Sequence, residues 1–216
     1  MRYQTPLLLS LFCLFSQVAI AVDSYNHLYN QSKKNLWSKV YRDGGETLYC
    51  GQKFSRSDRR GLNVEHVLPM AWVMNKFRCR DRGSCRQNPE FRQIEADMHN
   101  LFPVRMHINQ RRGSMPYGIV RGEPRELGSC DFEIDHHLRL VEPRNEVRGD
   151  IARTMAYMHE RYGIRIHYRQ QRLLLNWNRQ DPPSTHEKQR NALIEHIQGN
   201  RNKFIDEPDA VARLFR

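Results

Sequence analysis

The amino-acid sequence predicts a mixed α+β domain that is mainly helical. Apolar residues recur at helical spacing near the start of the chain and through its last third. Short alternating segments typical of β-strands lie between these regions. The strands and helices do not alternate regularly along the chain, which argues against a sheet built from βαβ units.

The first 21 residues are predicted to be a signal peptide. Arg2 supplies a positive charge, Leu7–Ile20 is an apolar run, and Ala19-Ile20-Ala21 matches a cleavage site. The run is short and is followed by Asp23, so we do not expect a membrane span. The mature part, 22–216, has 216 − 21 = 195 residues, which suits one domain in the periplasm or outside the cell.

The first half of the mature chain predicts a helix followed by short strands. Residues 24–42 have helical spacing, and Gly44-Gly45 ends this helix. Thr47–Cys50 is a strand candidate. Leu62–Leu68 alternates and contains β-branched residues, so we expect a strand that ends before Pro69.

The middle of the chain is expected to be less regular. Residues 75–90 are polar and basic and predict a loop closed by cysteines. Asn88–Leu101 predicts a helix that begins with an Asn cap and a first-turn Pro, and Pro103 is expected to stop it. Residues 107–130 are rich in Gly, Pro and Arg and should be mostly irregular.

The remainder predicts two strands and then helices. The strand candidates are 132–134 and 138–141. A helix over 150–163 would have Asp150 as its cap and Gly163 as its stop. A second helix, over 184–199, begins with a capping-box pattern and ends at a glycine.

The cysteines predict two disulfides. Cys13 leaves with the signal peptide, and the four that remain form an even number in an oxidising compartment. The short spacing of Cys79 and Cys85 favours a bridge between them, which would leave Cys50 to pair with Cys130, although four cysteines allow three pairings. A zinc site is disfavoured because no Cys-x-x-Cys spacing is present.

The charge of the chain favours a polyanionic partner. The formal charge is +11, and loss of Arg2 with the signal peptide makes it +10. Nucleic acid, an anionic membrane surface and a polysaccharide all fit this excess, as does a basic surface that only aids solubility. Basic residues cluster at Arg78, Arg80, Arg82, Arg86, Arg111 and Arg112. No segment resembles a helix that reads base edges, so binding to phosphates with low sequence specificity is expected.

Glu65, His66 and Asn100 can supply the chemistry of phosphodiester cleavage. A neutral histidine can take a proton from water, and carboxylate and amide oxygens suit magnesium, which keeps several waters. On a regular strand Glu65 and His66 point to opposite faces, so a shared site requires the strand to end or bend there. On an ideal helix Asn100 points roughly 140° away from the apolar stripe, which exposes its amide. Each residue also has an ordinary structural interpretation.

Two motifs together resemble the bacterial endonuclease I family, whose members are periplasmic or secreted nucleases. The motifs are Asn63–Pro69 and Glu95–Pro103, and the resemblance covers about Tyr25 to Pro208. Further matching segments are Tyr49-Cys50, Cys79 with Cys85, Arg148–Thr154, Trp177-Asn178 and Gln198–Asn202.

The resemblance implies a ββα-metal (His-Me finger) active-site core and a one-metal, Mg²⁺-dependent endonuclease. It gives His66 the role of general base, Glu65 and Asn100 the role of magnesium ligands, and Arg82 a contact with the scissile phosphate. The products would carry 5′-phosphates. The main substrate would be double-stranded DNA held by its backbone phosphates, with RNA left open. A monomer without a membrane partner is expected.

One segment departs from the family pattern. The family carries Glu-Val-Asn, then an arginine, a small residue and an asparagine. In His107–Ser114, Asn109 and Arg112 fit this pattern, whereas His107 replaces the acid and Ser114 replaces the last asparagine. Asp97 and His99 match the family motif and are predicted to support the site from outside it.

Two other functions remain as alternatives. A non-catalytic exported nucleic-acid-binding protein would bind DNA in EDTA and never cut it. A zinc hydrolase would need ligands from His99, His107, His136 and His137, which lack a His-Glu-x-x-His helix motif.

Overall fold

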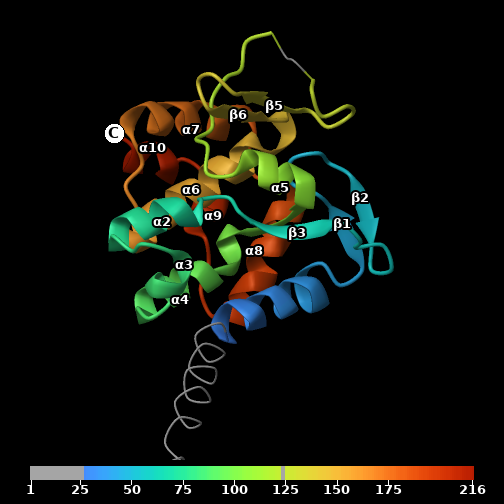
Figure 1. The fold of residues 1–216 in the computed structure, drawn as a ribbon, viewed down its shortest axis with the longest axis vertical. Helices are drawn as coiled ribbons and strands as arrows, with labels where there is room; N and C mark the ends of the chain where they lie inside the picture. Colours follow the sequence, from blue (N-terminus) through green and yellow to red (C-terminus); the bar gives the residue numbers. More distant parts are fainter. Residues whose placement is uncertain (1–26, 123–124) are drawn as a thin grey trace, which may run out of the picture.

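A computed structural model describes residues 27–122 and 125–216. These residues form helices and three separate two-stranded antiparallel sheets (Figure 1), which confirms a mixed, mainly helical fold. The predicted signal peptide, 1–21, lies outside the described residues. Within the described part of the chain, no helix is long and apolar enough to cross a membrane.

The elements follow the chain in this order. Residues 27–35 are helical and continue into the π-helical turn Leu36–Val40. The strands are β1 Gly44–Glu46, β2 Lys53–Ser55, β3 Leu62–His66, β4 Leu101–Arg105, β5 Phe132–Asp135 and β6 Leu140–Pro143. The helices are α2 Met70–Phe77, α3 Arg82–Cys85, α4 Pro89–Ala96, α5 Met106–Arg112, α6 Arg148–Tyr162, α7 Tyr168–Gln180, α8 Thr185–Gln198, α9 Lys203–Asp206 and α10 Ala210–Leu214. Short 3₁₀ turns span Met98–Asn100 and Asn145–Val147.

Strands β3 and β4 and helix α5 form the unit that carries the candidate site. The strands pair antiparallel, with Glu65 opposite Phe102 and His66 opposite Leu101. Helix α5 follows β4 directly and packs against both strands. Two strands separated by α2, α3 and α4 in sequence thus lie side by side beneath one helix.

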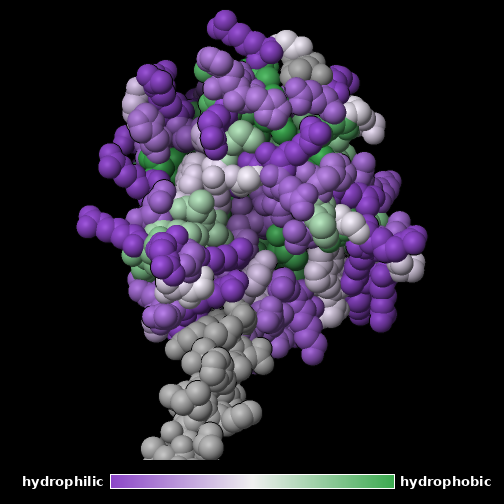
Figure 2. Space-filling view, in the orientation of Figure 1, coloured by the Kyte–Doolittle hydropathy of each residue, from purple (hydrophilic) through white to green (hydrophobic). Residues whose placement is uncertain are grey.

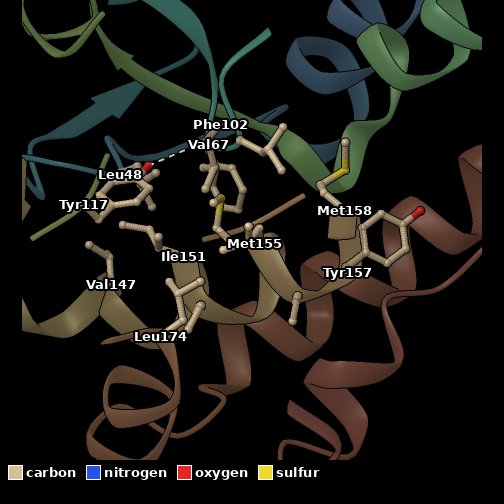
Figure 3. Close-up of a cluster of buried hydrophobic side chains, with 14 of the residues drawn as sticks. Leu48, Val67, Phe102, Tyr117, Val147, Ile151, Met155, Tyr157, Met158 and Leu174 are labelled. Atoms are coloured by element: carbon tan, nitrogen blue, oxygen red, sulfur yellow. Dashed lines mark hydrogen bonds between the residues drawn. The ribbon is translucent and has the colours of Figure 1, made fainter. Parts of the chain in front are cut away.

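Helix α6 forms the centre of the hydrophobic core. Its side chains Ile151, Met155 and Met158 are fully buried. Figure 3 shows them beneath Val67 and Phe102, which lie just after β3 and within β4. Packing is close in such an interior, so this core fixes the position of the strands that bear the candidate site.

The predicted helix over Asn88–Leu101 is wrong beyond Ala96. Asp97 leaves the helix with an extended backbone, and its carboxylate accepts a hydrogen bond from His99 N. The other carboxylate oxygen accepts bonds from the hydroxyls of Tyr157 (2.6 Å) and Tyr162 (2.5 Å). These long-range bonds override the local helical pattern. Asp97 is therefore a structural anchor, as predicted.

Pro103 lies inside β4 rather than at a helix end. It pairs with Val64 of β3, and its carbonyl accepts a hydrogen bond from Leu48 N (2.8 Å). Proline is tolerated where no partner requires its missing N–H, as on the outer side of a two-stranded sheet. The segment 107–130 was expected to be irregular, but residues 107–112 belong to α5.

The strand predicted at Thr47–Cys50 is a turn, and the strand lies earlier, at β1. Gly44 has φ +122°, and a Cβ added there would lie 2.2 Å from Phe54 O of the paired strand. Gly44 and Gly45 were expected only to end a helix, but they also allow β1 and β2 to pair closely. Helix α7 was not predicted as a separate helix.

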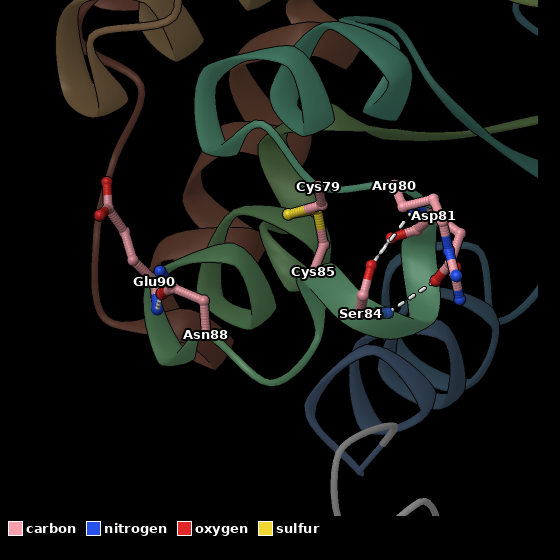
Figure 4. Close-up of a disulfide and its surroundings, with 7 residues drawn as sticks. All are labelled: Cys79, Arg80, Asp81, Ser84, Cys85, Asn88 and Glu90. Carbon is pink, nitrogen blue, oxygen red and sulfur yellow. Dashed lines mark hydrogen bonds and ion pairs between the residues drawn. A yellow bond between two sulfur atoms is a disulfide. The ribbon is translucent and has the colours of Figure 1, made fainter.

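Both favoured disulfides are present, Cys50–Cys130 and Cys79–Cys85. The second closes the basic segment expected to be a loop, and that segment contains the short helix α3. Asp81 caps α3 by accepting a bond from Ser84 N, while Ser84 Oγ contacts Asp81 in return (Figure 4). The bridge and the cap together hold α3 in place.

The remaining predicted ends are confirmed with small shifts. Strand β3 ends at His66, and β5 and β6 lie within one or two residues of their predicted ranges. Gly163 and Gly199 end α6 and α8 in left-handed conformations. Ser184 caps α8 as expected, whereas Asp150 lies in the first turn of α6 rather than at its cap.

Candidate active site

A cavity of about 410 Å³ opens where β3 ends. Its lining includes Glu65, His66, Arg82, Asn109 and Arg112, but not Asn100. The remaining lining residues are Tyr29, Asn63, Val64, Pro69, Met70, Ala71, Gln110, Gly113 and Ser114. Glu65 and His66 reach one cavity because the strand ends at His66, which meets the requirement set by their opposite directions on a regular strand.

His66 is held as a neutral base. It is 7% exposed, and its Nε2 donates to the carbonyl oxygen of Glu95 (2.9 Å), since a carbonyl can only accept. This leaves Nδ1 with the lone pair that can take a proton. Burial, aided by the positive charge of Arg82, lowers the pKa of His66 to about 4. The imidazole is therefore uncharged at neutral pH.

Glu65 is buried among donors. Its Oε1 accepts a hydrogen bond from the Tyr49 hydroxyl (2.7 Å) and lies 3.3 Å from Arg112 Nη1. Burial raises the pKa of Glu65, and Arg112 and Tyr49 act in the opposite direction by stabilising its charged form. Arg112 is 1% exposed and also donates to Val67 O (2.7 Å). The carboxylate is thus fixed at the cavity wall.

Glu95 connects the two sides of the cavity. Its carboxylate accepts from Arg82 Nε and from Arg86, including Arg86 Nη2 at 2.7 Å, while its backbone carbonyl holds His66. These arginines keep the pKa of Glu95 low despite its burial. Arg82 Nη2 is buried and has no hydrogen-bond partner within the described chain. Arg82 is thus held by Glu95 at the cavity, and its Nη2 is the donor that no described group engages.

Asn100 has a structural position outside the cavity. It is fully buried, its Oδ1 accepts from Leu68 N (2.7 Å), and its Nδ2 donates to Leu68 O (3.0 Å). Its amide thus pairs with both backbone groups of the residue two positions after His66. The structure does not bring Asn100 together with Glu65 and His66.

Asn109, on α5, lies at the cavity beside Glu65 and His66, where the sequence analysis had expected the amide of Asn100. It lines the cavity, and its Nδ2 donates to Val64 O (3.2 Å), which fixes the orientation of the amide. No hydrogen bond engages its Oδ1 among the described residues. An oriented amide oxygen and the Glu65 carboxylate therefore face the same space.

The donor set suits a hard divalent cation. Glu65 and Asn109 offer oxygen atoms, and magnesium is commonly bound by one or two protein oxygens with waters in its other positions. Among the described residues, no three His, Cys, Asp or Glu side chains are close enough to hold a metal. The histidines of the zinc alternative are not brought together there.

Several residues of the site were not singled out from the sequence. Glu95 could have been found as an acid on the apolar stripe of the predicted helix, since it follows Phe91 by four residues. Arg112 and Tyr49 lie in segments that resemble the family, but no sequence pattern indicated that they hold Glu65. Arg112 lies in a helix expected to be irregular, and Tyr49 lies in a turn expected to be a strand.

Comparison with known proteins identifies the family of this chain. The family model described as Endonuclease I matches residues 16–209. The chain belongs to the endonuclease I family. An extracellular deoxyribonuclease of Aeromonas hydrophila is 32% identical over 92% of this chain and 96% of its own length. A periplasmic deoxyribonuclease of the same species is 33% identical over 78% of this chain and 81% of its own length.

A relative that matches a shorter part of the chain is named for a different activity. An extracellular ribonuclease of Bacillus subtilis is 34% identical over 53% of this chain and 44% of its own length. Membership of the endonuclease I family makes this protein an exported nuclease. The predicted location in the periplasm or outside the cell is confirmed by the extracellular and periplasmic relatives.

Proposed function

We propose that this endonuclease I family member hydrolyses the phosphodiester bonds of double-stranded DNA in a Mg²⁺-dependent reaction with little sequence specificity. The observation that carries the proposal is the cavity where a neutral histidine, a buried carboxylate, an oriented amide oxygen and an arginine meet. Relatives named as deoxyribonucleases support DNA as the main substrate. The Bacillus ribonuclease supports RNA as a second substrate.

His66 acts as the general base in this proposal. Its neutral Nδ1 accepts a proton from the water that attacks phosphorus, while the Glu95 carbonyl holds the ring in place. The low pKa keeps the base free at neutral pH. The phosphate is oriented by the unused donor of Arg82, which Glu95 fixes from behind.

Glu65 and Asn109 are the residues that would hold Mg²⁺, and Asn109 replaces Asn100 in that role. When bound, the ion supplies charge stabilisation at phosphorus and at the leaving 3′ oxygen, so that 5′-phosphate products result. Tyr49 and Arg112 hold the Glu65 carboxylate in position. The amide of Asn109 is oriented by Val64 O.

Plasmid nicking tests the function directly. Wild-type protein should cut supercoiled DNA with magnesium and stop in EDTA, and His66→Ala should lose at least about 100-fold in rate, as expected for a general base. The matched control is His196→Ala, because His196 is exposed on α8. DNA binding that survives EDTA without cutting at any magnesium concentration would indicate a binding protein instead, and an unimpaired His66→Ala would remove the assigned base.

A further inference from the structure

A second basic pocket lies apart from the catalytic cavity. We call it the Trp37 pocket. Its volume is about 320 Å³, and it is lined by Lys34, Trp37, Ser38, Arg42, Arg56 and Arg59. These residues come from the helical segment before β1 and from the connection between β2 and β3. None of the lining side chains is acidic, so the pocket favours an anion.

Arg59 is held rigidly in this pocket. Its Nη2 donates to the backbone carbonyls of Tyr41 (2.6 Å) and Arg42 (3.0 Å). Its guanidinium lies 5.3 Å from the centre of the Trp37 ring, in a cation–π contact. Its Nε is buried and has no hydrogen-bond partner in the described chain. An arginine ordered in this way loses little freedom when it binds an anion.

Much of the positive charge of the pocket is uncompensated. Lys34 and Arg56 are in no ion pair or side-chain hydrogen bond within the described residues, whereas Arg42 pairs with Asp43 at 3.1 Å. Lys34, Arg56 and Arg59 therefore form no ion pair within the described residues, and the acid in their neighbourhood is Asp43, whose pKa is lowered by Arg42 and to a smaller extent by Arg56. The face of the molecule shown in Figure 2 is mostly hydrophilic.

The Trp37 pocket is close to the catalytic cavity along the chain. Tyr29 lines the cavity, and Trp37 follows it by eight residues on the same helical segment, about 12 Å along the axis. On the other side, Asn63 of the cavity wall follows Arg59 by four residues. At 3.4 Å per base step, about 12 Å corresponds to three or four nucleotides.

We propose that the Trp37 pocket is a second phosphate-binding site, which holds the backbone of the substrate nucleic acid about three or four nucleotides beyond Tyr29 of the catalytic cavity. The inference rests on the proposed function for the identity of the polyanion. Phosphate contacts at this distance add affinity and fix the direction of the strand without reading its sequence. Substrates too short to reach the pocket lose that affinity.

Binding measured in EDTA tests the site without cleavage. The first variant is Lys34→Ala/Arg56→Ala, and the second adds Arg59→Ala to this pair. The first variant keeps the test valid if Arg59 is needed for folding. With a duplex of about 30 base pairs, the triple variant should bind about 10-fold or more weakly. The slope of log K against log salt should shrink by up to about 3, because each phosphate contact contributes about 0.9. The control is Arg169→Ala/Arg172→Ala/Arg179→Ala on α7, at the opposite end of the view in Figure 1.

Three outcomes would overturn the proposal. The first is unchanged duplex affinity in both the double and the triple variants. The second is an equal loss of affinity in the α7 control, which would indicate a net-charge effect. The third is lost binding to phosphatidylglycerol vesicles while duplex affinity is retained, which would assign the pocket to lipid. If wild-type protein binds DNA through this pocket in EDTA but never cuts it, the proposed function fails and the site stands.

Discussion

Glu65 combines a proposed functional role with a role in folding. Its carboxylate is paired with Arg112, which is itself buried, and with the Tyr49 hydroxyl. Breaking a buried ion pair by removing one partner typically costs about 3–5 kcal/mol, because the other charge is left uncompensated. A Glu65→Ala variant would therefore mix lost metal binding with lost stability. Glu65→Gln keeps the shape of the side chain and is the cleaner test of the metal site.

Two asparagines should separate structural from metal-binding roles. Asn109→Ala removes a half-buried amide and should raise the magnesium concentration for half-maximal cutting about 10-fold or more, with little loss of stability. Asn100→Ala leaves both backbone groups of Leu68 unpaired and should lower the free energy of unfolding by about 2–4 kcal/mol. Magnesium titrations and urea unfolding measure these effects. A magnesium shift in Asn100→Ala alone would return the ligand role to Asn100.

The sequence predicted only some of the residues that line the candidate site. Glu65, His66 and Arg82 line the cavity as expected, because their motif positions do not depend on the surrounding helix. Asn100 does not, since its predicted exposure relied on a helix that Asp97 interrupts. The hydroxyls that bind Asp97 come from α6, about 60 residues later in the chain. No local pattern reveals such a contact.

At the scale of elements, sequence patterns were reliable where caps and glycines set the ends. Strand β3, helix α6 and helix α8 end where their stop signals predict. The patterns did not predict β4 and α5. Pro103 concealed the strand, and the basic residues that end α5 concealed the helix. β4 is defined by its pairing with β3, and α5 packs on both strands, so tertiary contacts decide both elements.

The two disulfides should have different effects when removed. Loop-closure entropy predicts a loss of about 2 kcal/mol for Cys79→Ser/Cys85→Ser and about 4–5 kcal/mol for Cys50→Ser/Cys130→Ser, because the loops differ greatly in length. The first pair closes the segment that carries Arg82, so its loss should also lower the cutting rate about 10-fold at temperatures where the protein stays folded. Thermal unfolding and steady-state rates measure both effects. An unchanged rate would show that α3 holds Arg82 without the bridge.

At the scale of the whole molecule, a buried histidine should make stability depend on pH. Burial lowers the pKa of His99 to about 4, and its ring nitrogen Nε2 donates to Asn200 O (3.0 Å). Between pH 6.5 and about 4 the unfolded chain binds the proton and the folded chain does not, so the contribution of His99 to stability falls as pH falls. Wild-type protein should lose up to about 3 kcal/mol more than His99→Gln between pH 7 and 4.

Urea unfolding of both proteins across this pH range measures the difference. The comparison isolates His99 because other buried groups, such as Asp150 with its raised pKa, titrate in both proteins alike. His99→Gln should be less stable at pH 7, since it loses the ring contact with Tyr157. Parallel stability curves for the two proteins would show that folding leaves the pKa of His99 unchanged.

The Cys50–Cys130 bridge also bears on where the candidate site is fully stabilised. It joins the turn that carries Tyr49, a support of Glu65, to a segment 80 residues further along the chain. In the reducing cytoplasm neither bridge persists, and the chain there lacks the covalent links that stabilise its candidate site. Because the protein is exported, the two bridges form only after the chain has left the reducing cytoplasm, so the candidate site gains its covalent support outside that compartment.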